Sequence, residues 1–286
     1  MFGLVGTIPD NSFPLAEGQV KVEADRLILG DLSVSVNRGT PALIAAAVET
    51  LKYLNQPEPY CYLVGDIGDG AGSKKLYKYL ADQLSSSAFT TLTFHYYQPD
   101  VFWFKKVVAA IEIMNTRPLL IADAGFMYVA KMSGSASFFD LFTPDVGELA
   151  YLADEKAPHP FYTRGFILHE DNLVPDLIKR AYQHGNAAAY LLVKGATDYI
   201  ADHNGILAKV DNPLEDSMEA IGGTGDTLTG IVSALISSGM TIENAAVIAA
   251  KVNRLSGSLA KPNPASQIYD LIKHIPSALA EILKEC

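Results

Sequence analysis

The chain has little of what marks a disulfide-rich, membrane or nucleic-acid-binding protein. Its 286 residues include two cysteines, Cys61 and Cys286, too few and too far apart for a disulfide framework or a zinc site. Apolar runs such as residues 43–48 fall far short of the roughly 20 residues that cross a bilayer, and no basic leader precedes an apolar stretch near Met1. Lys and Arg number 22 against 32 Asp and Glu, and the net charge of −10 disfavours a nucleic-acid partner. A cytoplasmic enzyme is expected.

Short apolar segments alternate with longer amphipathic ones along most of the chain. The short segments suit strands covered on both faces, and the long ones suit helices that pack one stripe inward. This alternation predicts a three-layer α/β/α fold with a mostly parallel central sheet. Because no linker rich in Gly, Ser or Pro divides the sequence, a single domain over residues 1–286 is predicted.

The periodicity also places the individual elements. An Asn-Gly pair predicts a hairpin over residues 198–210, and residues 157–171 are expected to form an irregular loop. Strands are expected at residues 61–65, 90–94, 118–123, 141–143 and 190–194, and helices at residues 40–54, 73–84, 101–114, 173–184, 227–238, 242–259 and 266–284.

The most informative segment is the glycine-rich turn Gly222-Gly223-Thr224-Gly225-Asp226, which directly precedes an apolar helix. Glycines expose backbone N–H groups, and the first turn of a helix adds unpaired donors and the positive end of the helix dipole. A phosphate can bind there without a basic side chain. The carboxylate of Asp226 would repel that phosphate unless it is needed, for example to accept a proton from a hydroxyl that attacks the phosphate. The alternative is a flexible turn in which Thr224 or Asp226 caps the helix.

This turn resembles the ribokinase-like superfamily, and its form Gly-Gly-Thr-Gly-Asp-Thr-Leu-Thr-Gly is most similar to the NAD(P)H-hydrate dehydratase branch. Two upstream segments are similar to the same branch: Lys194-Gly195-Ala196 and the stretch from Thr143 to Glu148. The three motifs follow the order of the branch and cover about residues 118–258. The resemblance implies a ribokinase-like fold without a separate lid domain.

The resemblance also implies roles for single residues. Asp226 would be the catalytic base, and Asn253 would border the adenine of ATP or ADP. Glu148 and Asp145 would order Mg²⁺, because a hard cation prefers carboxylate oxygens. Alternatively, the segment that contains them is an ordinary helix entry, and Lys194 is a surface residue with a buried stem. The residues that would bind the nucleotide are Gly222, Gly223, Thr224, Gly225, Lys194, Gly195 and Asn253.

The N-terminal 115 residues resemble the branch poorly, which leaves the substrate open. Residues 94–100 stand where the branch has a Gly-Pro-Gly-Leu-Gly loop. Asp123, at a strand end, either faces a ligand or caps the next helix. A second glycine-rich turn, at residues 65–74, either approaches a ligand with backbone donors or is a tight strand-to-helix turn. His95 and the other histidines show no close metal-ligand spacing and are interpreted as structural or surface residues.

Three functions fit these residues. The first is an ATP- or ADP-dependent NAD(P)H-hydrate dehydratase-like enzyme that works through phosphoryl transfer to a substrate hydroxyl. The second is a kinase of a sugar or vitamin-precursor alcohol, which shares that first step. The third is a catalytically silent nucleotide-binding protein; Asp226 argues against it, because an anion binder gains nothing from that charge. Since no lid strands are evident near the start of the chain, a homo-oligomer with a small-molecule substrate is expected.

Overall fold

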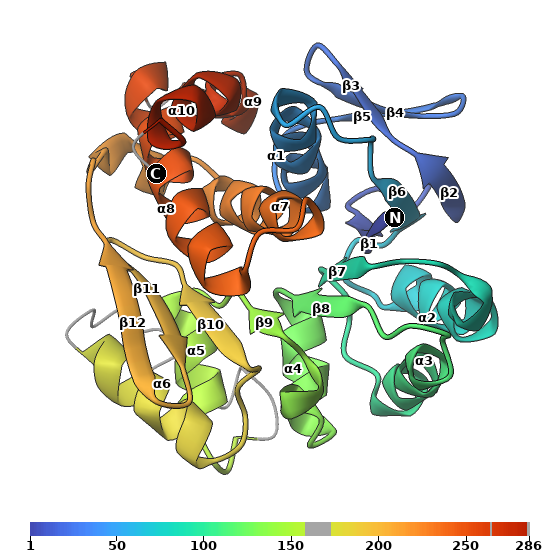
Figure 1. Ribbon diagram of the computed structural model, residues 1–286. Helices are drawn as coiled ribbons and strands as arrows, with labels where there is room; N and C mark the ends of the chain where they lie inside the picture. Colours follow the sequence, from blue (N-terminus) through green and yellow to red (C-terminus); the bar gives the residue numbers. More distant parts are fainter. Residues whose placement is uncertain (158–172, 264, 285–286) are drawn as a thin grey trace. The chain divides into compact units, whose positions relative to one another are not determined.

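The computed structural model describes residues 1–157, 173–263 and 265–284, in which helices and strands alternate (Figure 1). The described strands form one sheet of nine, in the order β12-β11-β10-β9-β8-β7-β1-β6-β2, and one of three, β3-β4-β5. In the large sheet, β7, β8, β9 and β10 pair in parallel and β11 is antiparallel to β10. The predicted mostly parallel sheet is therefore confirmed. The strands are β1 (Phe2–Ile8), β2 (Ala16–Gln19), β3 (Lys21–Glu23), β4 (Arg26–Leu29), β5 (Leu32–Ser35), β6 (Tyr60–Gly65), β7 (Thr91–His95), β8 (Leu119–Ala122), β9 (Leu141–Phe142), β10 (Tyr190–Val193), β11 (Asp198–Asp202) and β12 (Gly205–Val210).

The helices confirm most of the predicted boundaries to within three residues. None of the helices in the described part of the chain is long and apolar enough to cross a bilayer. The predicted loop at residues 157–171 lies, apart from its first residue, outside the described residues. The helices are α1 (Thr40–Tyr53), α2 (Ala71–Gln83), α3 (Val101–Glu112), α4 (Gly125–Met132), α5 (Val146–Ala153), α6 (Val174–Gln183), α7 (Thr224–Ser237), α8 (Ile242–Ala260), α9 (Ile268–Ile272) and α10 (Ile275–Ile282), with short 3-10 helices at Leu84–Ser86, Ala136–Phe138 and Asp216–Ala220.

Contacts divide the chain into two compact units. Unit 1 comprises residues 1–4, 16–62 and 210–286, and unit 2 comprises residues 5–15 and 63–209. Unit 1 carries the glycine-rich turn before α7, and unit 2 carries the other two motifs, around Lys194 and Glu148. The single domain over residues 1–286 stays a prediction.

Unit 1 is built on the packing of α1 against α7, with α8 against α7 and α10 (Figure 1). The closest approach falls at Gly230, where a Cβ atom would lie 2.1 Å from the backbone oxygen of Leu43. Only a glycine allows the two helix backbones to come this close. The single helix predicted for residues 266–284 is wrong: it is divided into α9 and α10. Pro276, in the first turn of α10, has no N–H to donate, and its ring would clash with the carbonyl of Ile272, where α9 ends.

Unit 1 also holds the three-stranded sheet, which the sequence analysis did not foresee. Two-residue loops join its strands, since Glu23 pairs with Arg26 and Leu29 pairs with Leu32. Gly30, in the second loop, has a φ of 56°, and such positive values are typical of tight hairpin turns. The sequence analysis predicted no strands in this part of the chain.

Unit 2 contains the parallel strands and an aromatic core beside them. Phe126 of α4 stacks on Phe94 of β7, with ring centroids 4.2 Å apart. Tyr97 and Phe104 also contact the Phe126 ring, at 5.1 and 5.3 Å. Because the carboxyl ends of parallel strands share one edge of a sheet, His95, Asp123 and Lys194, at the ends of β7, β8 and β10, are brought to the same edge.

Candidate functional site

The glycine-rich turn forms the start of α7. The helix begins at Thr224, its N-cap is Gly223, and no side chain caps it, so the interpretation of Thr224 or Asp226 as a cap is wrong. The N–H groups of Thr224, Gly225 and Asp226 have no acceptor within the helix, because the first turn lies before any carbonyl they could reach. Gly222 is exposed, and Gly223, Thr224 and Gly225 are half-buried. The turn therefore has the geometry of an anion site at a helix start.

Position 223 is the place in the turn where a residue other than glycine would not fit. Its φ of 108° lies in the left-handed region, where a side chain causes strain. A Cβ atom there would also lie 3.0 Å from Cγ1 of Ile268 and 3.3 Å from Cα of Arg38. Gly222, by contrast, has no positive φ, and a Cβ there would meet only the Arg38 side chain at ordinary contact distance.

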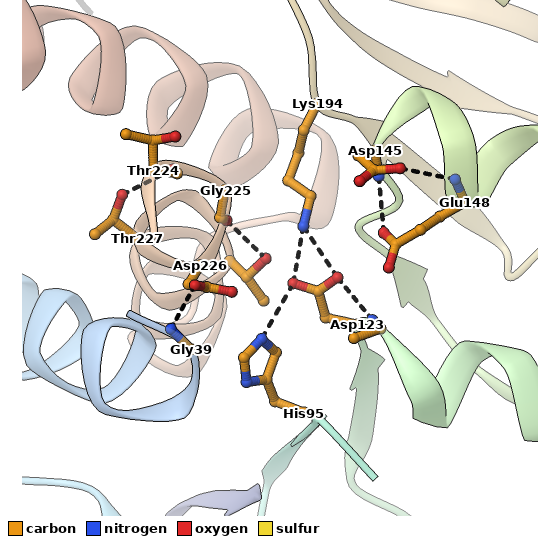
Figure 2. A network of polar contacts seen from close by, with 12 residues as sticks. Gly39, His95, Asp123, Asp145, Glu148, Lys194, Thr224, Gly225, Asp226 and Thr227 are labelled. Carbon is orange, nitrogen blue, oxygen red and sulfur yellow. Dashed lines mark hydrogen bonds and ion pairs between the residues drawn. The ribbon is translucent and has the colours of Figure 1, made fainter. Parts of the chain in front are cut away.

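Asp226 is buried and points to the start of a second helix. Its Oδ2 accepts a hydrogen bond of 2.7 Å from the backbone N–H of Gly39, the N-cap of α1 (Figure 2). A carboxylate at a helix start is stabilised by the positive end of the dipole. Asp226 is thus held as a buried acid in a fixed orientation, as a proton acceptor requires.

Asn253 of α8 braces the same turn. Its side-chain N–H donates to the backbone oxygen of Thr224 at 3.0 Å, and its Oδ1 accepts from the hydroxyl of Thr227 at 2.7 Å. Both ends of the amide therefore fix the first turn of α7. The adenine contact implied by the resemblance stays a prediction.

In unit 2, Lys194 forms a buried ion pair with Asp123. Its Nζ lies 3.0 and 2.9 Å from the two carboxylate oxygens, and the side chains are 12% and 2% exposed (Figure 2). The surface interpretation of Lys194 is therefore wrong. The alternative in which Asp123 caps the next helix is wrong as well, because the N-cap of α4 is Ala124, without a side-chain cap.

His95 adds a third side chain to this pair. It is buried, and its Nε2 lies 3.8 Å from Oδ2 of Asp123. The sequence interpretation of His95 as structural or surface missed this neighbourhood. The sequence did contain a signal for it. His95 ends an apolar strand, and Asp123 and Lys194 directly follow apolar strands, so all three are expected at the same edge of the sheet.

Asp145 and Glu148 form a capping box at the start of α5. The backbone N–H of Glu148 donates to Oδ1 of Asp145 at 2.7 Å, and the backbone N–H of Asp145 donates to Oε2 of Glu148 at 2.9 Å. The helix-entry interpretation is thus confirmed. Oε1 of Glu148 also accepts from the hydroxyl of Tyr128 at 2.8 Å.

The electrostatics of Glu148 are unusual for a carboxyl group. Burial raises its pKa to about 8, with further increases from Asp145 and Asp123 that Lys194 partly opposes. A cation near these acids would relieve this repulsion. Their donor chemistry fits Mg²⁺, because all are carboxylate oxygens. Oδ1 of Asp145 and both Glu148 oxygens already accept hydrogen bonds, so a metal ion would have to use their remaining lone pairs or bound water.

The second glycine-rich turn is a structural turn. The carboxylate of Asp66 accepts the backbone N–H groups of Gly68, Gly70 and Ser73, at 2.8, 3.1 and 2.7 Å, together with the Ser73 hydroxyl. These hydrogen bonds hold the pKa of Asp66 below its usual value, although burial acts in the opposite direction. The turn's donors are used internally, which confirms the strand-to-helix interpretation.

Comparisons with known proteins agree with this architecture. A family model described as NAD(P)H-hydrate dehydratase matches residues 103–279. An uncharacterized protein of Methanocaldococcus jannaschii is 44% identical over 85% of this chain and 100% of its own length. The ADP-dependent (S)-NAD(P)H-hydrate dehydratase of Cenarchaeum symbiosum is 30% identical over 61% of this chain, and the match spans 56% of that relative. A solved ribokinase-like superfamily protein of Enterococcus faecalis, 13% identical, covers 98% of this chain and 87% of its own with a TM-score of 0.59, which confirms the predicted fold.

Proposed function

This chain belongs to the NAD(P)H-hydrate dehydratase family, nucleotide-dependent lyases of the ribokinase-like superfamily, and on this basis we propose that it dehydrates a hydrated nicotinamide nucleotide at the expense of ADP or ATP. The observation that carries the proposal is the start of α7. Its first N–H groups have no acceptor within the helix, and its first-turn acid, Asp226, is held by the backbone of another helix.

In the proposed reaction, Asp226 accepts the proton of the substrate hydroxyl while the hydroxyl oxygen attacks the terminal phosphorus of the nucleotide. The bond from that phosphorus to the nucleotide breaks, and a phosphate ester of the substrate forms. The ring nitrogen then expels the phosphate, and loss of a ring proton restores the dihydronicotinamide. The chain contributes alignment and charge stabilisation at the helix start.

The remaining residues are assigned as binding residues. Gly222, Gly223, Thr224 and Gly225 would hold the transferred phosphoryl group. Lys194 and Gly195 would lie along the nucleotide. The positive charge of Lys194 is already paired with the carboxylate of Asp123. Asp145 and Glu148 would hold Mg²⁺, which when bound supplies positive charge to the phosphates. Asn253 would border the adenine while bracing the turn.

The proposal is tested with the full chain, a hydrated dinucleotide and either ADP or ATP, with and without Mg²⁺. The expected result is the appearance of the dihydronicotinamide absorbance together with one inorganic phosphate per turnover, and neither without nucleotide. A stable phosphorylated alcohol without phosphate release would show a kinase instead. Nucleotide binding without turnover of the hydrate or of a panel of alcohols would support the silent binding protein.

Two expectations about the whole molecule accompany this proposal. We propose a cytoplasmic enzyme that forms a homo-oligomer, as expected from the sequence. The support for oligomerisation is that no lid strands are evident in the sequence near the start of the chain, where the structure has the small sheet of β3, β4 and β5. The subunit number therefore stays a prediction, and a monomeric mass by light scattering would contradict it.

A further inference from the structure

An arginine that no motif singled out lies against the glycine-rich turn. Arg38 directly precedes Gly39, the N-cap of α1, and its side chain is exposed. Its Cδ lies 3.5 Å, and its Cβ 3.8 Å, from the position that a Cβ atom on Gly222 would occupy. The stem of Arg38 thus runs along the bare face of Gly222. The guanidinium begins at the next atom of the side chain.

Arg38 has no hydrogen bond or ion pair with any other residue in the described ranges. Several other basic side chains form hydrogen bonds or ion pairs. Lys194 is paired with Asp123, Arg117 with Asp140, and the guanidinium of Arg26 donates to the Ser33 and Ser35 hydroxyls. The chain has ten more acidic than basic residues. An arginine without an ion-pair partner among the residues that the structure describes, placed beside a candidate anion site, is therefore a candidate ligand for that anion.

A phosphate bound at the turn would bring more negative charge than the turn itself offsets. The backbone N–H of Gly39, at the start of α1, already donates to the carboxylate of Asp226. Of these two helix starts, a phosphate would therefore bind at the start of α7. A helix start is equivalent to roughly half a positive charge. A terminal phosphate carries about two negative charges near neutral pH, and Asp226 adds another nearby. A guanidinium reduces this imbalance, and its planar fork can bind two phosphate oxygens at once.

We propose that Arg38 is a phosphate-binding residue of the α7 turn, and that its guanidinium binds the terminal phosphate of the nucleotide. The inference rests on the proposed function, because it takes the anion at the turn to be a nucleotide phosphate. Arg38 would add a charged side-chain donor to the backbone N–H donors of the turn. The absence of a side chain at Gly222 leaves the Arg38 stem in direct reach of the turn.

The test compares Arg38→Gln and Arg38→Lys with Lys52→Gln in the full-length protein. Lys52 is an exposed residue in the last turn of the same helix, so its replacement removes the same charge at the far end of α1. Binding of ADP and of AMP is measured by calorimetry at several salt concentrations, without any hydrate. Thermal unfolding checks that each variant is folded.

For Arg38→Gln, ADP binding is expected to weaken roughly 10- to 100-fold, the range for a lost charged hydrogen bond. The salt dependence of binding should also become shallower. Arg38→Lys should recover part of the loss, and AMP binding and the Lys52→Gln variant should match the unchanged protein. Equal ADP binding by Arg38→Gln, an equal loss for AMP, or no ADP binding by the unchanged protein would overturn the inference.

The two proposals fail in different ways. If the unchanged protein binds ADP through Arg38 but does not dehydrate the hydrate, the proposed function is wrong and the phosphate contact stands. If the unchanged protein catalyses dehydration and Arg38→Gln binds ADP equally well, the proposed function stands and the role of Arg38 is wrong.

Discussion

The carboxylate of Asp226 and the backbone N–H of Gly39 are joined by a buried hydrogen bond of 2.7 Å, although 187 positions separate them in the chain. The acid is therefore oriented by main-chain geometry at the start of a second helix. A backbone donor has no side-chain rotamers of its own, so the carboxylate is presented in one direction. This pre-organisation suits a general base whose substrate must align with a phosphate.

Replacing Asp226 by Asn is expected to separate binding from chemistry. The Asn side-chain oxygen can still accept from the Gly39 N–H, so the turn and the affinity for nucleotide should be retained. Turnover should fall by about 10²–10⁴, the usual contribution of a general base. The checks are calorimetry for ADP and steady-state kinetics with the hydrate. Unchanged turnover would remove Asp226 from the mechanism.

Substitution of Gly230 by Ala is expected to be costly. The added methyl would lie 2.1 Å from the Leu43 backbone oxygen, so α1 and α7 must move apart. Overpacking of this kind typically costs about 1–3 kcal/mol, and the shift should strain the Asp226–Gly39 hydrogen bond and lower activity as well. Urea unfolding and steady-state kinetics measure the two effects.

Gly257→Ala is the matched control for that substitution. Its new methyl would come within 2.0 Å of Sδ of Met218, another severe overlap. Here the obstacle is a flexible side chain and not backbone, so the chain can adjust. The loss of stability should be clearly smaller than for Gly230→Ala. Equal losses of stability in the two variants would show that the backbone contact of α1 with α7 at Gly230 is no less tolerant of an added methyl than the side-chain contact at Gly257.

Breaking the Asp123–Lys194 pair from one side should destabilise the protein more than removing both charges. Lys194→Met leaves an uncompensated buried carboxylate, and such changes typically cost about 3–5 kcal/mol. The double variant Asp123→Asn with Lys194→Met should recover a large part of that loss. Urea unfolding of both single variants and the double variant measures the coupling, and additive losses would show that the pair is not coupled.

Glu148 predicts a pH dependence of stability whose sign is set by its raised pKa. The ordinary pKa is 4.5 and the folded value is about 8, so between these values the folded state holds a proton that the unfolded state has lost. Stability should therefore fall as pH rises through this window. In Glu148→Gln without added metal, the decline between pH 5 and pH 8 should be smaller than in the unchanged protein. Parallel declines in urea unfolding would contradict the assignment.

Local sequence patterns were enough for the parallel strands β7, β8, β9 and β10, but they did not predict strand β1 or helices α4 and α5. Strand β8 was predicted because its apolar run is short and is followed by a polar strand end, and α1 because its apolar residues repeat with helical spacing. The hairpin of β11 and β12 followed from its Asn-Gly turn. The short strands β3, β4 and β5 were missed because three or four residues give too little periodicity to detect.

The sequence by itself determined the chemical inventory: a glycine-rich helix start with an acid in its first turn, in the order of motifs of its family. Only the tertiary structure decided which groups meet. The contact of Asp226 with Gly39, the pairing of Lys194 with Asp123 and the position of Arg38 beside Gly222 each join residues far apart in the chain. Such contacts depend on helix packing and sheet order, and no local pattern records them.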